Sequence, residues 1–235
     1  MKSPQNSNVS AIILAAGESR RMAGMDKMFA SLRGNPIIHY SIKALNDSHR
    51  ISSITLVVSS SNLERSKDLV KQNKYHKVNS ICIGGQRRQD SVLIGLEKLS
   101  DSEWILVQDG ARPFIDNNLI NESLHAAKQT GSSVAAIPIN DTVKLVNSDL
   151  LITKTIPRDR LWAAQTPQVF KTNILMNAHK DIKKDVTDDA NMIELIGCKS
   201  KIFTGYSHNI KITTQEDLYL AEIIMQNHNE DRSKL

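Results

Sequence analysis

The loop that follows the first apolar run of the sequence combines small residues with positive charge. The run covers residues 9–14, and the loop contains Ala15, Ala16, Gly17, Arg20, Arg21 and Lys27. Small side chains leave backbone N–H groups uncovered, so that a phosphate group can approach them closely. Three cations beside them suit a triphosphate, although a plain turn next to a solvated basic surface has the same composition. The spacing matches neither the GxGxxG fingerprint nor the P-loop, so it predicts neither nicotinamide binding nor γ-phosphate transfer.

Two further loops carry groups that suit a nucleotide. The segment "QDGARP" places Asp109 at the end of an apolar run. One carboxylate together with substrate phosphates is how proteins usually hold Mg²⁺, and the alternative is an ordinary Asp-Gly turn. The segment "GGQRRQDS" contains Gly85 and Ser91. Its backbone is suited to contact the edge of a base, while Asp90 or Ser91 is equally suited to cap a helix.

Apolar runs that are typical of strands alternate with runs of helical periodicity over the first 130 residues. Strands are expected at 9–14, 53–59, 79–85 and within 103–113, and helices at 35–45, 62–72, 90–99 and 117–129. Asn35 is expected to cap its helix, with Pro36 at the first helical position. This alternation predicts an α/β fold, a Rossmann-like and mostly parallel sheet with helices on both faces. Because ligands bind beyond the carboxyl ends of such strands, we expect the three polar loops to meet there.

The pattern changes near residue 133. After a strand in "SSVAAIPI", residues 141–165 lack helical periodicity, and "TVKLV" and "LLITKTI" predict a β-hairpin that is inserted as an arm. Helices are expected at about 171–181 and 187–196, a strand at 200–204, and then a short strand and a helix that Thr214 caps. The chain, 1–235, is expected to form one domain, with flexible tails at 1–8 and 228–235.

Composition limits the class of protein. Only 4% of the residues are aromatic and no basic reader motif is present, so nucleic acid is not an expected partner. No apolar run approaches the ~20 residues of a membrane helix, and no membrane association is expected. Cys82 and Cys198 are far apart and lack metal-binding spacing, which fits a reducing cytoplasm.

Seven motifs occur in an order that points to a known family. They are "AAGESRRM…K", "GGQRRQDSV", "QDGARP", "DTVK", "PRDRLWAAQTPQVF", "VTDDA" and "NIKITTQEDL". Together they closely resemble the methylerythritol phosphate cytidylyltransferases, within the sugar-phosphate cytidylyltransferase family, from about residue 9 to residue 227. The resemblance implies a single nucleotidyltransferase domain that transfers CMP from CTP to 2-C-methyl-D-erythritol 4-phosphate. It also implies that pyrophosphate is released and that the reaction belongs to the non-mevalonate synthesis of isoprenoid precursors.

The resemblance also implies roles for individual residues. Those that would bind the nucleotide are Ala15, Ala16, Gly17, Gly85 and Ser91. Arg21 and Lys27 would be catalytic, and Asp109 would bind Mg²⁺ or another divalent cation. Those that would bind the sugar phosphate are Thr142, Arg158, Thr187 and Lys211.

The arm predicts a homodimer. A hairpin with several apolar side chains is costly to expose to water, and burial against a second copy resolves this. In the family that the sequence resembles, the arm reaches into the partner, so Thr142 and Arg158 would complete a shared active site. Two alternatives remain open from sequence: a ribitol 5-phosphate cytidylyltransferase, and a nucleotide-binding protein that has lost catalysis.

Overall fold

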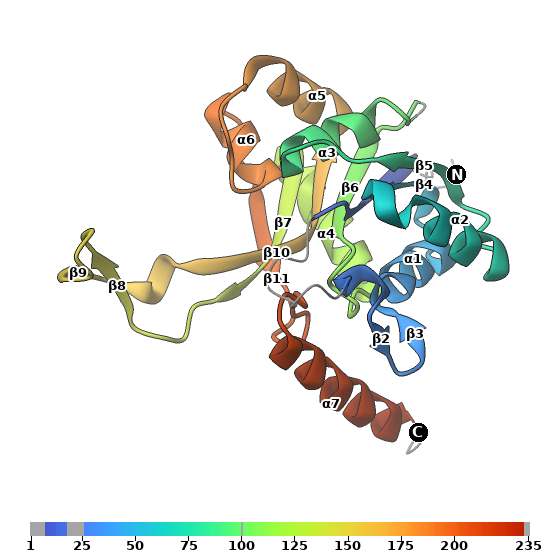
Figure 1. Ribbon diagram of the computed structural model, residues 1–235. Coiled ribbons are helices and arrows are strands. Elements are labelled where there is room, and N and C mark those ends of the chain that lie inside the picture. The colour runs from blue at the N-terminus through green and yellow to red at the C-terminus, as the bar shows by residue number, and fades with distance from the viewer. Residues whose placement is uncertain (1–7, 18–25, 100, 233–235) are drawn as a thin grey trace, which may run out of the picture.

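A seven-stranded sheet forms the centre of the molecule (Figure 1). The computed structural model describes residues 8–17, 26–99 and 101–232, and the side chains up to residue 227. In spatial order the strands are β11 (Lys201–Thr204), β7 (Ser132–Pro138), β10 (Trp162–Lys171), β6 (Trp104–Asp109), β1 (Val9–Ala15), β4 (Ile51–Val58) and β5 (Val78–Ile83). Only β10 is antiparallel to its neighbours, so the predicted mostly parallel α/β sheet is confirmed.

Helices cover both faces of the sheet. On one face lie α1 (Ile37–Asp47), α2 (Leu63–Gln72) and α4 (Asn117–Thr130), and on the other lie α3 (Arg88–Leu96), α5 (Thr172–Asp181) and α6 (Asp189–Leu195). Successive side chains of β1 alternate between these layers, as a strand requires. Ile13 packs in the cluster that contains Leu45 of α1, whereas Ile12 packs with Val92 of α3.

The sheet contains one strand that the sequence analysis did not separate from the arm. β10 pairs with β6 on one side and with β7 on the other, and its register with β7 shifts between Ala164 and Gln168. The first four residues of β10 fall inside the predicted arm, 141–165. β10 is not recognisable in the sequence because a central strand normally shows an unbroken apolar run, and Pro167 with the polar residues beside it interrupts that run.

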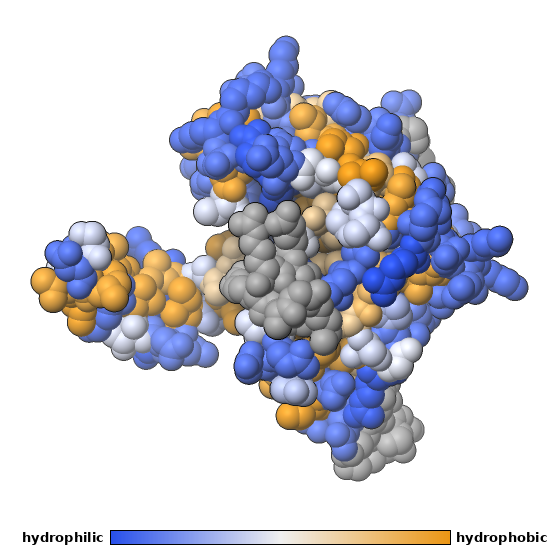
Figure 2. All heavy atoms as spheres, in the orientation of Figure 1, coloured by the Kyte–Doolittle hydropathy of each residue, from blue (hydrophilic) through white to orange (hydrophobic). Residues whose placement is uncertain are grey.

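The arm contains the predicted hairpin. β8 (Val143–Val146) pairs with β9 (Ile152–Ile156) in antiparallel register, and a 3-10 turn at Arg158–Arg160 follows. The hairpin projects away from the body of the molecule (Figure 1). In Figure 2 the projecting arm at the left shows hydrophobic surface. The apolar side chains of the hairpin that are more than 40% exposed are Leu145, Val146, Leu150, Leu151 and Ile152.

The predicted start of the helix at 35–45 is wrong. Asn35–Pro36 forms the short strand β3, paired with β2 (Ser31–Leu32), so α1 begins at Ile37 and Asn35 does not cap it. The two residues form β3 because the chain reverses direction at the turn 33–34, which brings them into antiparallel pairing with β2.

No strand forms in the segment before the last helix, α7 (Gln215–Arg232). The predicted cap of α7 is confirmed: Thr214 Oγ1 accepts a hydrogen bond from Asp217 N at 3.3 Å, and the Asp217 carboxylate accepts one from Thr214 N at 2.9 Å. α7 continues into the predicted tail 228–235. Of the predicted tails at 1–8 and 228–235, residues 1–7 and 233–235 lie outside the described residues. Within the described chain, no helix combines the length and the apolar character that crossing a membrane requires.

Candidate active site

A cleft of about 580 Å³ opens at the carboxyl ends of β1 and β6, beside the start of α3. It is lined by Leu14, Ala16, Gly17, Lys27, Met28, Gly85, Gln86, Arg87, Arg88, Ser91, Asp109, Ala111 and Lys211. The three polar loops therefore meet at one edge of the sheet, as predicted. Ala15 does not line the cleft, because it is buried at the end of β1.

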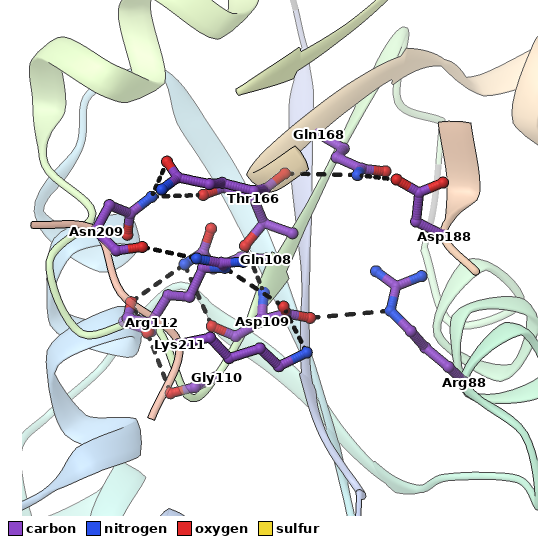
Figure 3. A network of polar contacts seen from close by, with 12 residues as sticks. Arg88, Gln108, Asp109, Gly110, Arg112, Thr166, Gln168, Asp188, Asn209 and Lys211 are labelled. Carbon is purple, nitrogen blue, oxygen red and sulfur yellow. Dashed lines mark hydrogen bonds and ion pairs between the residues drawn. The ribbon is translucent and has the colours of Figure 1, made fainter. Parts of the chain in front are cut away.

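Asp109 lies among three positively charged side chains (Figure 3). Its carboxylate is 2.9 Å from Lys211 Nζ, 3.6 Å from Arg112 Nε and 3.9 Å from Arg88 Nε. Burial raises the pKa of this carboxyl, but the charges of Lys211, Arg88 and Arg112 together outweigh burial and hold the pKa below its ordinary value. Asp109 is therefore a charged group at neutral pH.

Buried polar residues fix the position of Asp109. Its backbone N–H donates to Thr166 Oγ1 at 3.0 Å, and the Thr166 carbonyl accepts from Asn209 Nδ2 at 2.9 Å. Arg112 donates to the Asn209 carbonyl at 2.7 Å (Figure 3). This network connects β6, β10 and the segment that carries Lys211. No role was predicted for Thr166 or Asn209, although both lie in motifs that carried the resemblance.

The side chain of Ser91 holds the loop that contains Gly84 and Gly85, called here the glycine loop. Its Oγ accepts a hydrogen bond from Gly85 N–H at 3.1 Å and contacts the Arg87 carbonyl at 3.3 Å. The capping role belongs to Asp90, whose carboxylate accepts from Arg87 N at 3.0 Å and thereby satisfies a free N–H at the start of α3. Gly84 packs so tightly that a Cβ there would lie 2.4 Å from Ala16 Cβ. The glycine loop and the loop after β1 are thus in direct contact.

Arg88 is a cleft residue to which the sequence analysis gave no role. It forms an ion pair with Asp189 at 2.7 Å, and the Asp189 side chain is completely buried. It also faces Asp109, at 3.9 Å. The neighbouring Arg87 points instead toward Asp90 and Asp185. The first turn of α3 therefore connects the cleft to the start of α6.

Lys27 lies in the short 3-10 turn Lys27–Phe29, at the rim of the cleft. Asp26 caps this turn by accepting from Met28 N at 3.1 Å, and Arg65 pairs with Asp26 at 3.2 Å. These contacts fix the backbone that carries Lys27. Arg21, predicted to be catalytic, lies outside the described residues, as does Arg20.

Three predicted sugar-phosphate ligands are not among the described residues that line the cleft of this single chain. Thr142 and Arg158 are exposed on the arm, where Arg158 donates to the Asn140 carbonyl. Thr187 is exposed on the segment between α5 and α6. Lys211 is the fourth predicted ligand, and it lies in the cleft.

The described residues contain no group of three or more His, Cys, Asp or Glu side chains placed to hold a metal ion by themselves. Asp109 offers the hard oxygen that Mg²⁺ prefers. A divalent cation in this cleft would need additional oxygen ligands, which the phosphates of a bound nucleotide can supply.

Comparisons with known proteins agree on one family. The sequence matches the family described as 2-C-methyl-D-erythritol 4-phosphate cytidylyltransferase over residues 9–227. A protein of that name from Dehalococcoides mccartyi is 48% identical over 221 residues, which cover 94% of this chain and 97% of the relative.

Solved structures of similar proteins show the same fold. One is 4-diphosphocytidyl-2C-methyl-D-erythritol synthase from Anaerococcus prevotii, with a TM-score of 0.83, 28% identity, and coverage of 94% of this chain and 97% of that one. Another is 2-C-methyl-D-erythritol 4-phosphate cytidylyltransferase from Thermus thermophilus, with a TM-score of 0.76, 28% identity, and coverage of 93% and 99%.

Proposed function

The chain belongs to the 2-C-methyl-D-erythritol 4-phosphate cytidylyltransferase family, and from this premise we propose that its cleft transfers CMP from CTP to 2-C-methyl-D-erythritol 4-phosphate. The reaction releases pyrophosphate and serves the non-mevalonate synthesis of isoprenoid precursors. The observation that supports this use of the cleft is Asp109 among Lys211, Arg112 and Arg88, beside two glycine loops. Such a site suits a ligand that combines a divalent cation with several phosphates.

CTP is proposed to bind between the two loops at the carboxyl ends of β1 and β5. Ala16 and Gly17 leave room for the phosphates, since a Cβ on Gly17 would meet nothing within 4 Å. Gly85, held by Ser91, is proposed to face the cytosine. We assign charge stabilisation at the α-phosphate and the leaving group to Lys27 and, by family resemblance, to Arg21.

Mg²⁺ is proposed to bind through Asp109 and the phosphate oxygens of CTP. The residues fit such an ion, because Asp109 is held ionised and its carboxylate faces the cleft. When bound, the cation supplies positive charge that offsets the negative charge of the phosphates. The protein's own part is to hold Asp109 in place through Thr166 and to balance its charge with Lys211.

The chemical step needs no protein nucleophile. A phosphate oxygen of the sugar alcohol attacks the α-phosphorus of CTP, and a new P–O bond forms. The bond between the α-phosphorus and the bridging oxygen breaks, and its electron pair leaves with pyrophosphate. Because the attacking phosphate monoester is already anionic near neutral pH, the protein has to align the two anions and stabilise their charge.

The sugar phosphate is proposed to contact Lys211 and Thr187 of one chain and Thr142 and Arg158 of a second. This proposal includes a homodimer in which each arm reaches the partner's cleft. The exposed apolar side chains of the hairpin support it, because their burial against a second copy removes apolar surface from water. Because Cys82 and Cys198 are free thiols, which suit a reducing compartment, we also propose a cytoplasmic location.

The test of the reaction is pyrophosphate release from CTP with a panel of acceptors. We expect release with 2-C-methyl-D-erythritol 4-phosphate, dependent on Mg²⁺, to be much faster than with ribitol 5-phosphate. The comparisons do not favour the ribitol alternative, since the relatives named above are methylerythritol phosphate enzymes. Faster release with ribitol 5-phosphate would overturn the assigned acceptor.

The shared site is tested by mixing two inactive proteins, Lys27→Ala and Arg158→Ala. A mixed dimer contains one site with neither substitution, so we expect part of the activity to return. Labelled subunits must first be shown to exchange. If they exchange and no activity returns, the two residues do not serve one composite site.

A further inference from the structure

The segment between α5 and α6, residues 182–188, is held by side chains at the start of α3, from its N-cap Arg87 and from Gln89. A loop of this kind must find partners for its backbone groups outside a helix or sheet. The Lys183 carbonyl accepts from Arg87 at 3.0 Å, and the Lys184 carbonyl accepts from Gln89 Nε2 at 3.0 Å. Gln89 Oε1 in turn accepts from Val186 N–H at 3.1 Å.

Gln89 is the buried member of this set. Its side chain is 5% exposed, and both ends of its amide group are used on the segment. The contacts that Arg87 makes lie in solvent, where ion pairs contribute little. Ile182 and Val186 pack their side chains against the core and keep the segment near the sheet. The two hydrogen bonds of the Gln89 side chain fix the backbone of the segment.

Thr187 lies between two fixed points. On one side, Val186 is held by Gln89. On the other, Asp188 caps α6 by accepting from Asn191 N at 2.8 Å and also accepts from Gln168 Nε2 at 2.8 Å (Figure 3). The orientation of the Thr187 side chain therefore depends on both anchors. One anchor is in α3, whose first turn also supplies cleft residues.

We propose that Gln89 is a positioning residue for the acceptor: by holding Lys184 and Val186 it sets the place of Thr187 relative to the cleft. This inference rests on the proposed function, in which Thr187 contacts the sugar phosphate. Gln89 itself does not line the cleft. Its loss should therefore weaken acceptor binding more than CTP binding.

The experiment compares the wild-type protein with Gln89→Met, which keeps the volume and removes both hydrogen bonds. We expect KM for 2-C-methyl-D-erythritol 4-phosphate to rise about tenfold, the factor that one net hydrogen bond supplies, with KM for CTP changed less than about twofold. Asp185→Asn, which removes only an exposed ion pair with Arg87, is the control and should match the wild type.

A second readout does not depend on turnover. Hydrogen exchange at Val186 N–H should be about tenfold faster in Gln89→Met, whereas Asn191 N–H, which Asp188 holds, should be unchanged. Unchanged exchange at Val186, or equal increases of both KM values, would overturn the proposal, as would an Asp185→Asn protein that reproduces the effect. A wild-type protein that is inactive on the acceptor would instead refute the proposed function. The exchange measurement would still test whether Gln89 holds the segment 182–188.

Discussion

Replacing Gly84 by Ala should destabilise the protein and disturb the cleft together. A Cβ at this position would lie 2.4 Å from Ala16 Cβ, 2.7 Å from Ser91 Oγ and 3.2 Å from Val57 Cγ1. Overpacking of this kind costs about 1–3 kcal/mol, and moving Ser91 also removes the hydrogen bond to Gly85 N–H, which contributes about 1 kcal/mol. We expect a loss of about 2.5 kcal/mol, which for a chain of this length lowers Tm by about 5–10 °C.

The assay combines thermal and urea unfolding with the KM for CTP. Because Ala16 and Ser91 both line the cleft, KM for CTP should rise in the Gly84→Ala protein. The substitution Ala16→Gly removes the closest contact, so the double variant should regain about 1 kcal/mol relative to additivity. Gly17→Ala is the matched control, because its new Cβ meets nothing within 4 Å. Its stability should stay within about 0.5 kcal/mol of the wild type, while its methyl group occupies space that we assign to CTP.

Two results would refute this reasoning. One is a Gly84→Ala protein that melts at the wild-type temperature. The other is an Ala16→Gly substitution whose effect simply adds to that of Gly84→Ala, since additivity would mean that the two loops do not press on each other. Either outcome would show that the loops after β1 and β5 can separate at little cost.

Three further predictions concern charge. Lys27→Ala should lower turnover at saturating CTP by about two to three orders of magnitude, which is the effect of losing one preorganised charge, and should change Tm little. Near-normal turnover would show that Lys27 is not part of the site. Asp109→Asn should lower turnover and raise the Mg²⁺ concentration needed for half-maximal rate, and an unchanged Mg²⁺ titration would exclude Asp109 as the ligand. Burial lowers the pKa of His179, and this outweighs the attraction of Asp189, so protonation opposes folding. The free energy of unfolding should therefore decrease as pH falls below about 6.5, the ordinary pKa of histidine. In urea titrations at pH 7.5 and 5.5, His179→Leu should remove part of this decrease. The control is the exposed residue His76, whose substitution His76→Leu should leave the decrease unchanged.

The parallel strands could be predicted because each is an apolar run that ends in a polar loop. β1, β4 and β6 have buried side chains along nearly their whole length, so their sequences show no polar alternation. β10 could not be predicted in this way. Its buried half includes Gln165, Thr166 and Gln168, and these polar side chains are satisfied by partners on Asn209, Asp109 and Asp188. Their partners are distant in sequence, so no local pattern reveals them.

The cleft residues were predictable to different degrees for a similar reason. Asp109 and Ser91 stand at the ends of elements that periodicity locates. Arg87 and Arg88 are neighbours with the same chemistry, yet only Arg88 reaches Asp109 and Asp189. The rotation of the first turn of α3 decides which of the two arginines faces Asp109, and the Asp90 cap sets where that turn begins. The local sequence spacing does not determine, to within one residue, where α3 begins or how its first turn is rotated.

The antiparallel strand relates the arm to the cleft. β7 runs parallel to β6, so its last residue, Pro138, lies at the same edge of the sheet as Asp109. β10 starts at that edge with Trp162, which pairs with Pro138, and continues to Thr166, which holds Asp109. Both strands that carry the arm thus begin or end at the edge where the cleft opens. The insertion of a single antiparallel strand therefore accounts both for the support of Asp109 and for the edge of the sheet from which the arm leaves.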